Sequence, residues 1–273
     1  MSEDIHPLRH PDDAMRPVPF RGGGFNPGRR PMAAVLAFFL LLSVWEAGSR
    51  LGYISDLFLP SPGQIGIAFW ELFQSGDLWR HLSASLSRLI SGWILGTIAG
   101  LTLGFAIGMF TLARSVGISL VSALFPIPKI ALLPLFIIWF GIGEPSKIAT
   151  IFFGVFFPTV INTYSSVDNV NRNFIRMGQS FNLSTFAIVR KIILPGSLPG
   201  ILAGFRISAS IGIILLVAAE MIGAEYGIGA LVLAAGNLMQ TDLLIAGVVM
   251  LSLLGLGIAF LLSKVEARLL RWR

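Results

Sequence analysis

The stretch Gly92–Gly108, with the sequence GWILGTIAGLTLGFAIG, decides the class of fold. It carries no charged side chain, and with its apolar flanks (about 84–110) it is long enough for a helix that crosses a bilayer. Glycine recurs at every fourth position, so the glycines share one side of that helix. They are Gly92, Gly96, Gly100, Gly104 and Gly108. We interpret this ridge as a seam for close helix packing; a flexible gating helix is the alternative, because glycine lowers helix propensity.

The composition of the whole chain agrees with a membrane protein. Of its 273 residues, 55% are hydrophobic and only 12% are charged, and the mean hydropathy is +0.80. Soluble domains carry about 25% charged residues, so this chain lacks the polar residues that cover a water-facing surface. A net charge of +6 suggests nucleic acid binding in a soluble protein. Here the basic residues flank apolar runs, which is typical of membrane proteins.

Six apolar runs are candidates for membrane spans. They cover about 31–51, 84–110, 116–140, 148–163, 195–222 and 243–262. The third run contains Pro126, Pro128 and Pro134, which predicts a kinked or split span. The fourth run is short, which predicts a span with little tilt. We therefore expect an all-α membrane protein with six transmembrane helices.

The distribution of basic residues predicts how these spans are oriented. With the N-terminus inside, fourteen Lys and Arg residues fall in cytoplasmic segments and four fall outside. By the positive-inside rule, both termini are then cytoplasmic. Residues 1–31, rich in Pro, Gly and Arg, are predicted to be a disordered basic cytoplasmic tail, and 32–273 to be the membrane domain. The segment at about 166–194 would face the cytoplasm.

The chain lacks the usual motifs of enzymes. It has no cysteine, and His6 and His10 lie in the polar tail, so we expect neither a thiol nucleophile nor a metal site. No P-loop, dinucleotide-binding or zinc-protease motif occurs. We expect no catalytic residues. Either the membrane domain functions by itself, or a separate chain supplies the energy for its function. A membrane enzyme, which needs polar groups meeting at one depth, and a channel or scaffold subunit are the alternatives.

The segment 166–194 combines charge with signals for short helices. Asp168 or Asn171 can cap a first helix, and Asn182 suits the left-handed position that ends it. Ser184 can cap a second helix that leads into the fifth span. The apolar contacts of the first helix would come from Phe174, Ile175, Met177 and Phe181. These signals predict a rigid unit of two short helices, and an ordinary interfacial linker is the alternative.

The spacing within this segment resembles the cytoplasmic "EAA" signature of importer permeases of the ABC transporter superfamily. In that signature E-A-A is followed by Gly at the seventh position and by I-x-L-P at positions seventeen to twenty. The end is matched by Ile192, Leu194 and Pro195. The first three positions fall on Arg176, Met177 and Gly178, and the seventh falls on Asn182. Arg176 reverses the charge of the acid, so any contact that depends on that acid must be made differently.

Four further blocks resemble the nitrate/sulfonate/taurine subfamily of these permeases. They are FLPSPGQI (58–65), IPKIALLPLFIIWFGIGEPSKI (127–148), LAGFRISAS (202–210) and AAEMIGAEYGIGAL (218–231). The resemblance covers about residues 33–268, and WFGIGEPSK is its most specific part. It implies that 32–273 is a type I ABC importer permease domain in a bacterial inner membrane, with a coupling helix between spans four and five.

The resemblance also implies partners and a mechanism. A second permease subunit would complete a homodimer, two cytoplasmic ABC ATPases would bind ATP and Mg²⁺, and a periplasmic or lipid-anchored binding protein would deliver solute. No cofactor would bind this chain itself. The importer would move a small anionic solute (nitrate, a sulfonate or taurine) by alternating access; an uncharged or cationic vitamin precursor is the alternative. ATPase coupling would fall to Phe174, Arg176, Met177, Gly178, Phe181, Asn182, Ser184, Ile192, Leu194 and Pro195.

Ionisable residues inside spans are candidates for the translocation pathway. They are Lys129, Arg206 and Glu220, with Ser210 on the same helix face as Arg206. We place Glu220 near the outer end, facing the binding protein or water. Structural pairing or snorkelling is the interpretation that we favour for Arg206 and Glu220, and contact with the solute is the alternative. Between the first two spans, FLPSPGQI is followed by GIAFWELFQSG (66–76), which predicts an amphipathic helix that lies on the outer surface.

Overall fold

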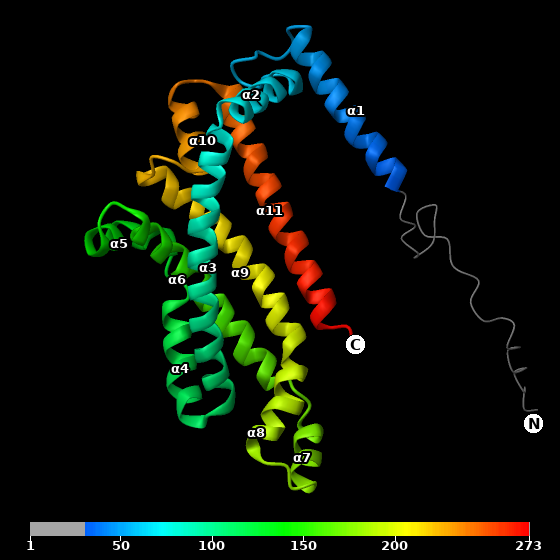
Figure 1. Ribbon diagram of the computed structural model, residues 1–273, viewed down its shortest axis with the longest axis vertical. Coiled ribbons are helices and arrows are strands. Elements are labelled where there is room, and N and C mark those ends of the chain that lie inside the picture. The colour runs from blue at the N-terminus through cyan, green and yellow to red at the C-terminus, as the bar shows by residue number, and fades with distance from the viewer. Residues whose placement is uncertain (1–30, 273) are drawn as a thin grey trace, which may run out of the picture.

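The structure, a computed structural model, describes residues 31–272 and consists of helices joined by turns and short loops. Four helices in this range are long and apolar enough to cross a membrane. They are α3 (Asp77–Met109), α6 (Glu144–Asp168), α9 (Leu194–Gly223) and α11 (Thr241–Leu269). These helices form the body of the molecule (Figure 1). The all-α membrane fold predicted from the sequence is confirmed, whereas the predicted disordered tail lies outside the described residues.

The first and third apolar runs form α1 (Pro31–Arg50) and a broken pair of helices. α4 (Thr111–Leu124) is followed by a 3₁₀ turn (Lys129–Leu132) and α5 (Leu133–Phe140), with a bend of 86° at the break. Pro126 and Pro128 lie in that break, so the predicted split of the third run is confirmed. The bent pair raises the number of candidate spans in the described range to five. Six spans with both termini in the cytoplasm stay a prediction.

α6 is longer than the sequence analysis predicts. Instead of the short run 148–163, the helix has 25 residues, from Glu144 to Asp168. Pro145 is tolerated in the first turn, where its missing N–H costs little. Pro158 is tolerated inside the helix because neighbouring helices support membrane helices at prolines. The prediction of a short span is therefore wrong, whereas its tilt stays a prediction.

The centre of the bundle is the contact between α3 and α6, and it is built on glycine. Each glycine of the α3 ridge faces an α6 side chain, and those side chains are also four residues apart: Ile151, Val155, Thr159, Thr163 and Val167. A Cβ placed on any of the five glycines would lie 2.5–2.8 Å from an α6 atom. The two helices therefore fit too closely for any larger residue, which is the geometry of a packing seam.

α6 is also packed on its other side, against α9. Gly204 of α9 lies against Asn162, and Gly212 lies against Val155. Leu216 of α9 is fully buried in a cluster with Ile151 and Leu89. α6 therefore lies between α3 and α9, and movement of α6 requires movement of both neighbours.

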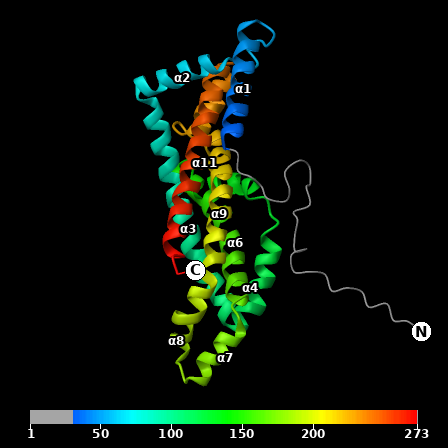
Figure 2. The same ribbon diagram turned by 90° about the vertical axis from the view of Figure 1, so that its right-hand side faces the viewer.

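α2 (Pro62–Ser75) lies across one end of the bundle (Figures 1 and 2). Ser61 and Gln64 form a capping box at its start. Its buried face carries Ile65 and Leu72, which join a core cluster with α10 (Ile228–Asn237) and α11. Its other face exposes Trp70, whose ring stacks on Phe73. The predicted amphipathic helix is confirmed, and its place on the outer surface stays a prediction.

The bundle has two unlike ends. One end is covered by α2 and α10, and we call it the α2–α10 end. The other end is formed by α7 (Arg172–Ser180) and α8 (Thr185–Ile188), and we call it the α7–α8 end. Figure 2 shows α7 and α8 projecting beyond the long helices, opposite α2.

Candidate functional site

The α7–α8 end is held rigid by side-chain caps. Asn171 caps α7 by accepting a hydrogen bond from the amide of Asn173 (2.9 Å). Asn182 has φ 54°, the left-handed conformation that ends the helix, and Ser184 caps α8 through the amide of Ala187. These caps are the ones that the sequence predicts, with Asn171 rather than Asp168 in the first position. A π-helical turn (Val189–Ile193) then joins α8 to α9 without a break.

The inner side of α7 rests on this support through Gly178. Gly178 is buried, and a Cβ there would lie 2.9 Å from Cδ1 of Ile192 and 3.4 Å from Cγ1 of Ile188. Glycine therefore allows α7 to lie directly on α8 and the π-helical turn. Leu194 and Pro195 begin α9 immediately after that turn. α7 is thus connected through packed side chains to the start of a long helix.

The outer side of this module exposes apolar and basic side chains together. The exposed apolar residues are Phe174, Met177, Phe181 and Phe186, between 52% and 74% accessible. The exposed basic residues are Arg172, Arg176, Arg190 and Lys191. Within the described range none of these four forms an ion pair. Four large apolar side chains on a capped, rigid support outside the long helices form an unpartnered surface, which we call the α7–α8 surface.

Next to this surface, Arg114 and Asp168 join α4 to the end of α6. The guanidinium donates two hydrogen bonds of 2.8 Å to the two carboxylate oxygens. This bidentate pair lies just before the three residues that lead into α7. Asp168 is therefore part of the support of the module and not its cap.

The pathway candidates on α9 are held by neighbouring groups. The guanidinium of Arg206 is paired with the carboxylate of Glu266 on α11. The hydroxyl of Ser210 donates to the carbonyl of Arg206 (3.1 Å). Both residues line a cavity of about 180 Å³ between α9 and α11. Arg206 thus faces a groove, with its charge already balanced by a carboxylate.

Lys129 serves as a cap for α4. Its Nζ donates to the carbonyls of Leu124 (2.9 Å), Phe125 (2.9 Å) and Ile127 (2.7 Å). It also lies 4.5 Å from the ring centroid of Phe157. The cation therefore satisfies the carbonyl groups that the break between α4 and α5 leaves free.

Glu220 is paired inside the chain, which agrees with structural pairing and not with a side chain that faces water or a binding protein. Its side chain is completely buried. The carboxylate accepts hydrogen bonds from Arg88 (2.7 Å), from the hydroxyl of Ser85 (2.8 and 2.9 Å) and from the amide of Gly229 (2.9 Å). A buried carboxylate requires partners of this kind, and α3 and the start of α10 provide them.

Arg88 is the centre of a charge cluster that the sequence analysis does not find. Besides Glu220, its guanidinium binds the carbonyl of Tyr226 (2.6 Å) and both carboxylate oxygens of Glu144 (2.5 and 2.7 Å). Nζ of Lys147 lies 3.6 Å from the same Glu144 carboxylate. We call Arg88, Glu144, Lys147 and Glu220 the Arg88 junction. It joins α3, α6, α9 and the loop before α10.

The loop before α10 is shaped around this junction. Gly227 has φ 145°, and a Cβ there would lie 2.7 Å from Nη1 of Arg88. The amide of Ile228 donates to the Ser85 hydroxyl (2.8 Å), and Nδ1 of His81 lies 2.8 Å from the carbonyl of Gly227. The signal in the sequence was the pair Glu144 and Lys147 in WFGIGEPSK, but spacing alone could not show that Arg88 lies between Glu144 and Glu220.

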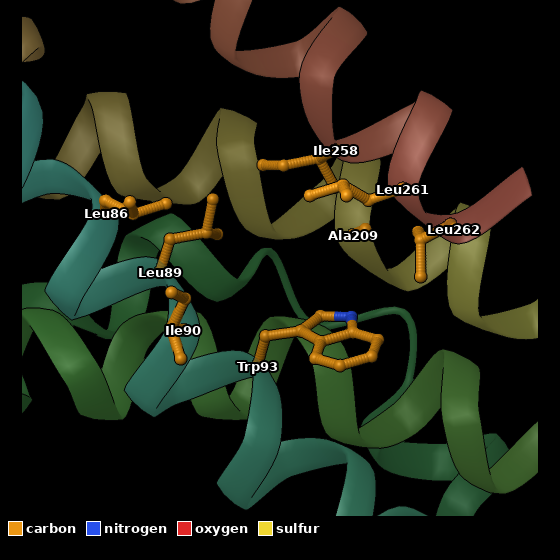
Figure 3. Close-up of a pocket in the computed structure, with 8 residues that line it drawn as sticks. All are labelled: Leu86, Leu89, Ile90, Trp93, Ala209, Ile258, Leu261 and Leu262. Carbon is orange, nitrogen blue, oxygen red and sulfur yellow. The ribbon is translucent and has the colours of Figure 1, made fainter. Parts of the chain in front are cut away.

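An apolar pocket lies between α3, α9 and α11 (Figure 3). Its volume is about 200 Å³, and Leu89, Trp93, Ala209 and Ile258 are among its lining residues. The only polar group of these side chains, the indole N–H of Trp93, donates to Ser208 (3.2 Å). This pocket offers nothing to bind a charged solute. No group of three or more His, Asp or Glu side chains in the described part of the chain could hold a metal ion.

Comparison with known families identifies the chain. A model described as "Binding-protein-dependent transport system inner membrane component" matches residues 92–271, more than half of the sequence. The chain belongs to this family. The taurine transport system permease protein of Escherichia coli (strain K12) is 37% identical over 238 residues, 85% of this chain and 86% of the relative.

Two further relatives share most of their length with this permease. A putative aliphatic sulfonates transport permease protein of Escherichia coli (strain K12) is 35% identical and covers 90% of this chain and 95% of the relative. The riboflavin transport system permease protein of Chloroflexus aurantiacus is 30% identical and covers 87% and 88%. Among solved structures, inward-facing conformations of the MetNI methionine ABC transporter match with a TM-score of 0.61. That match covers 71% of this chain and 96% of the other, at 22% identity, so it supports the fold.

These findings establish the class of the protein. It is a multi-pass inner-membrane permease with the fold of type I ABC importers, and it is the permease of an ATP-driven importer.

Proposed function

We propose that this permease imports a small anionic sulfonate of the taurine class. Two relatives that are named for taurine and aliphatic sulfonates match at 37% and 35% identity over nearly their whole length. Import of an uncharged or cationic vitamin precursor by the same architecture is the second candidate, which the riboflavin permease at 30% identity favours. Growth on taurine or an alkanesulfonate as sole sulfur source, with and without the gene, separates the two.

The partners that we propose follow from the family. A second copy of the chain forms the translocation pathway with the first, and a periplasmic or lipid-anchored binding protein delivers the solute. Two ATPase subunits bind ATP and Mg²⁺ in the cytoplasm, since the sequence of this chain contains no nucleotide-binding motif.

The observation that carries this proposal is the α7–α8 surface. Phe174, Met177 and Phe181 are exposed on a helix whose other side is fixed by Gly178. Apolar side chains presented by a capped helix fit a groove in a partner protein, and aromatic residues are frequent anchors of such contacts. We assign this groove to the ATPase subunit. The exposed Arg176 in place of the family acid favours acidic residues at the rim of that groove.

Movement of the ATPase then reaches the membrane by two routes. α7 is joined to α6 by three residues, next to the Arg114–Asp168 pair. It is joined to α9 through α8 and the π-helical turn. Because α6 also packs along α3 through the glycine seam, a displacement of α7 moves α3, α6 and α9 together. Opening and closing of the groove that holds Arg206 and Ser210 would follow from such a movement, as alternating access requires.

Substitution of Phe181 tests this assignment. The side chain is 73% exposed, so Phe181→Asp leaves the fold intact and places a charge in the ATPase contact. Loss of an aromatic anchor from an interface costs about 2 kcal/mol or more, or roughly thirtyfold in affinity. We expect solute uptake per ATP hydrolysed to fall by a similar factor in proteoliposomes.

The matched control is Phe58→Asp, at a side chain that is 80% exposed on the opposite end of the molecule. It makes the same change outside the α7–α8 surface, so uptake per ATP should stay at the wild-type value. Equal coupling ratios in wild-type protein and the Phe181 variant would show that the ATPase docks elsewhere.

A further inference from the structure

The Arg88 junction has two unlike halves. Glu220 is completely buried and is held by a side chain from α3 and a backbone amide from α10, as well as by Arg88. Glu144 is 54% exposed, and among the described residues its carboxylate is held by the side chains of Arg88 and Lys147 alone. The first half is a fixed part of the core. The second half is a carboxylate at the surface that contacts two buried cations and balances one of their two charges.

If this carboxylate leaves, Glu220 is the one carboxylate left among the described residues to balance the two cations. The side chains of Arg88 and Lys147 are only 5% and 6% exposed. With Glu144 in place, the junction holds two positive and two negative charges and is neutral. Without it, one buried positive charge remains uncompensated, which is costly inside a protein. An open junction therefore requires an anion from outside.

The chain around Glu144 allows the carboxylate to move. Glu144 is the first residue of α6, and the loop before it contains Gly141, with φ 83°, and Gly143. Ile142 between these glycines is 78% exposed and belongs to none of the three core clusters of the described residues. A rotation of the Glu144 side chain alone therefore releases the guanidinium of Arg88, while Ser146 and Lys147 in the same turn stay buried. A swing of Glu220 would instead disrupt α9 and α10 together.

We propose that Arg88 and Lys147 form an anion subsite that Glu144 occupies in the resting chain and that a sulfonate group takes over. This inference rests on the proposed import of a sulfonate. The Nε and Nη2 edge of Arg88 binds two oxygens side by side, as in its contact with Glu144, and a sulfonate offers the same pair of oxygens with the same charge. The subsite lies toward the α2–α10 end, opposite the surface assigned to the ATPase.

Competition from Glu144 makes this subsite weak, which suits transport. A carboxylate on the same chain acts at an effective concentration in the millimolar range or above. A free sulfonate must displace it, so the solute binds weakly and leaves easily, as a site along a pathway requires. Removal of the Glu144 carboxylate should therefore reveal the stronger intrinsic affinity of the subsite for a sulfonate.

The test measures binding by thermal shift of the purified permease–ATPase complex. The probes are taurine and ethanolamine, which share the amine but differ in the sulfonate. Because a ligand that binds the folded state raises the melting temperature, the concentration of half-maximal stabilisation reports affinity. For Glu144→Gln we expect taurine to act at a concentration at least about tenfold lower than in wild-type protein, and ethanolamine to have no effect.

Two further variants complete the design. Glu225→Gln removes an exposed carboxylate near the same end and should behave like wild-type protein. Lys147→Met added to Glu144→Gln should abolish the taurine shift. The proposal is overturned if Glu144→Gln and wild-type protein respond to taurine at the same concentration, or if ethanolamine stabilises as well as taurine. A failure of sulfonate uptake in a transport assay would instead contradict the proposed function.

Discussion

The two ends of this permease handle charge and apolar surface in opposite ways. At the Arg88 junction, toward the α2–α10 end, a guanidinium and a carboxylate are buried and bound to backbone groups of a shaped loop. At the α7–α8 end four basic side chains are exposed beside exposed phenylalanines. The difference indicates that the first region holds helices of one chain together, whereas the second is made to meet another chain.

The largest effect should come from the buried half of the Arg88 junction. Glu220→Gln removes a fully buried carboxylate and leaves Arg88 with less compensation, which typically costs about 3–5 kcal/mol. We expect the melting temperature of the permease to fall by roughly 10 °C, or the protein to fail to accumulate in membranes. The exposed Glu225→Gln is the control. If both variants have the same melting temperature, the junction does not hold the helices together, and the contrast between the two ends disappears.

A smaller effect is expected at the glycine seam that runs between the ends. Gly104→Ala places a Cβ 2.5 Å from Cβ of Thr163, so α3 and α6 must separate, at a cost of about 1–3 kcal/mol. The matched control is Gly66→Ala on α2, where no atom lies within 4 Å of the new Cβ. That change should leave thermal stability equal or slightly raised, because alanine favours helix. A Gly104 variant as stable as the control would show that the seam is loose.

The smallest effect on stability should come from the cap of α7. Asn182 has φ 54°, so Asn182→Val forces a β-branched residue into a left-handed conformation at a cost of about 1–2 kcal/mol. Because this strain is local, we expect uptake per ATP to fall while the melting temperature changes little. Asn182→Gly, which adopts this conformation freely, should keep full coupling. Full coupling in the valine variant would mean that α7 need not be rigid.

The features predicted from the sequence are those that local rules determine. Asn182 and Ser184 were predicted because helix ends have short-range signals, and the glycine ridge because four-residue spacing places residues on one side of a helix. The packing partner of that ridge could not be read from spacing. The length of α6 was underestimated at both ends, because the helix continues through the polar residues 144–147 and 164–168 that flank the apolar run.

The Arg88 junction was beyond sequence reasoning for a different physical reason. Arg88 and Glu220 are 132 residues apart in the chain and meet only because α3 and α9 pack side by side. Each charge taken alone is equally compatible with a surface position. Structural pairing of Glu220 could therefore be expected from the sequence, but neither its partner Arg88 nor its complete burial could be predicted.

The most direct test of the whole account is solute uptake by the reconstituted importer. The permease is placed in proteoliposomes with its ATPase and binding protein, and accumulation of radiolabelled taurine and of riboflavin is followed with and without ATP. The account predicts that taurine accumulates only with ATP and binding protein, that an alkanesulfonate competes, and that riboflavin stays outside. Accumulation of riboflavin without accumulation of taurine would contradict it.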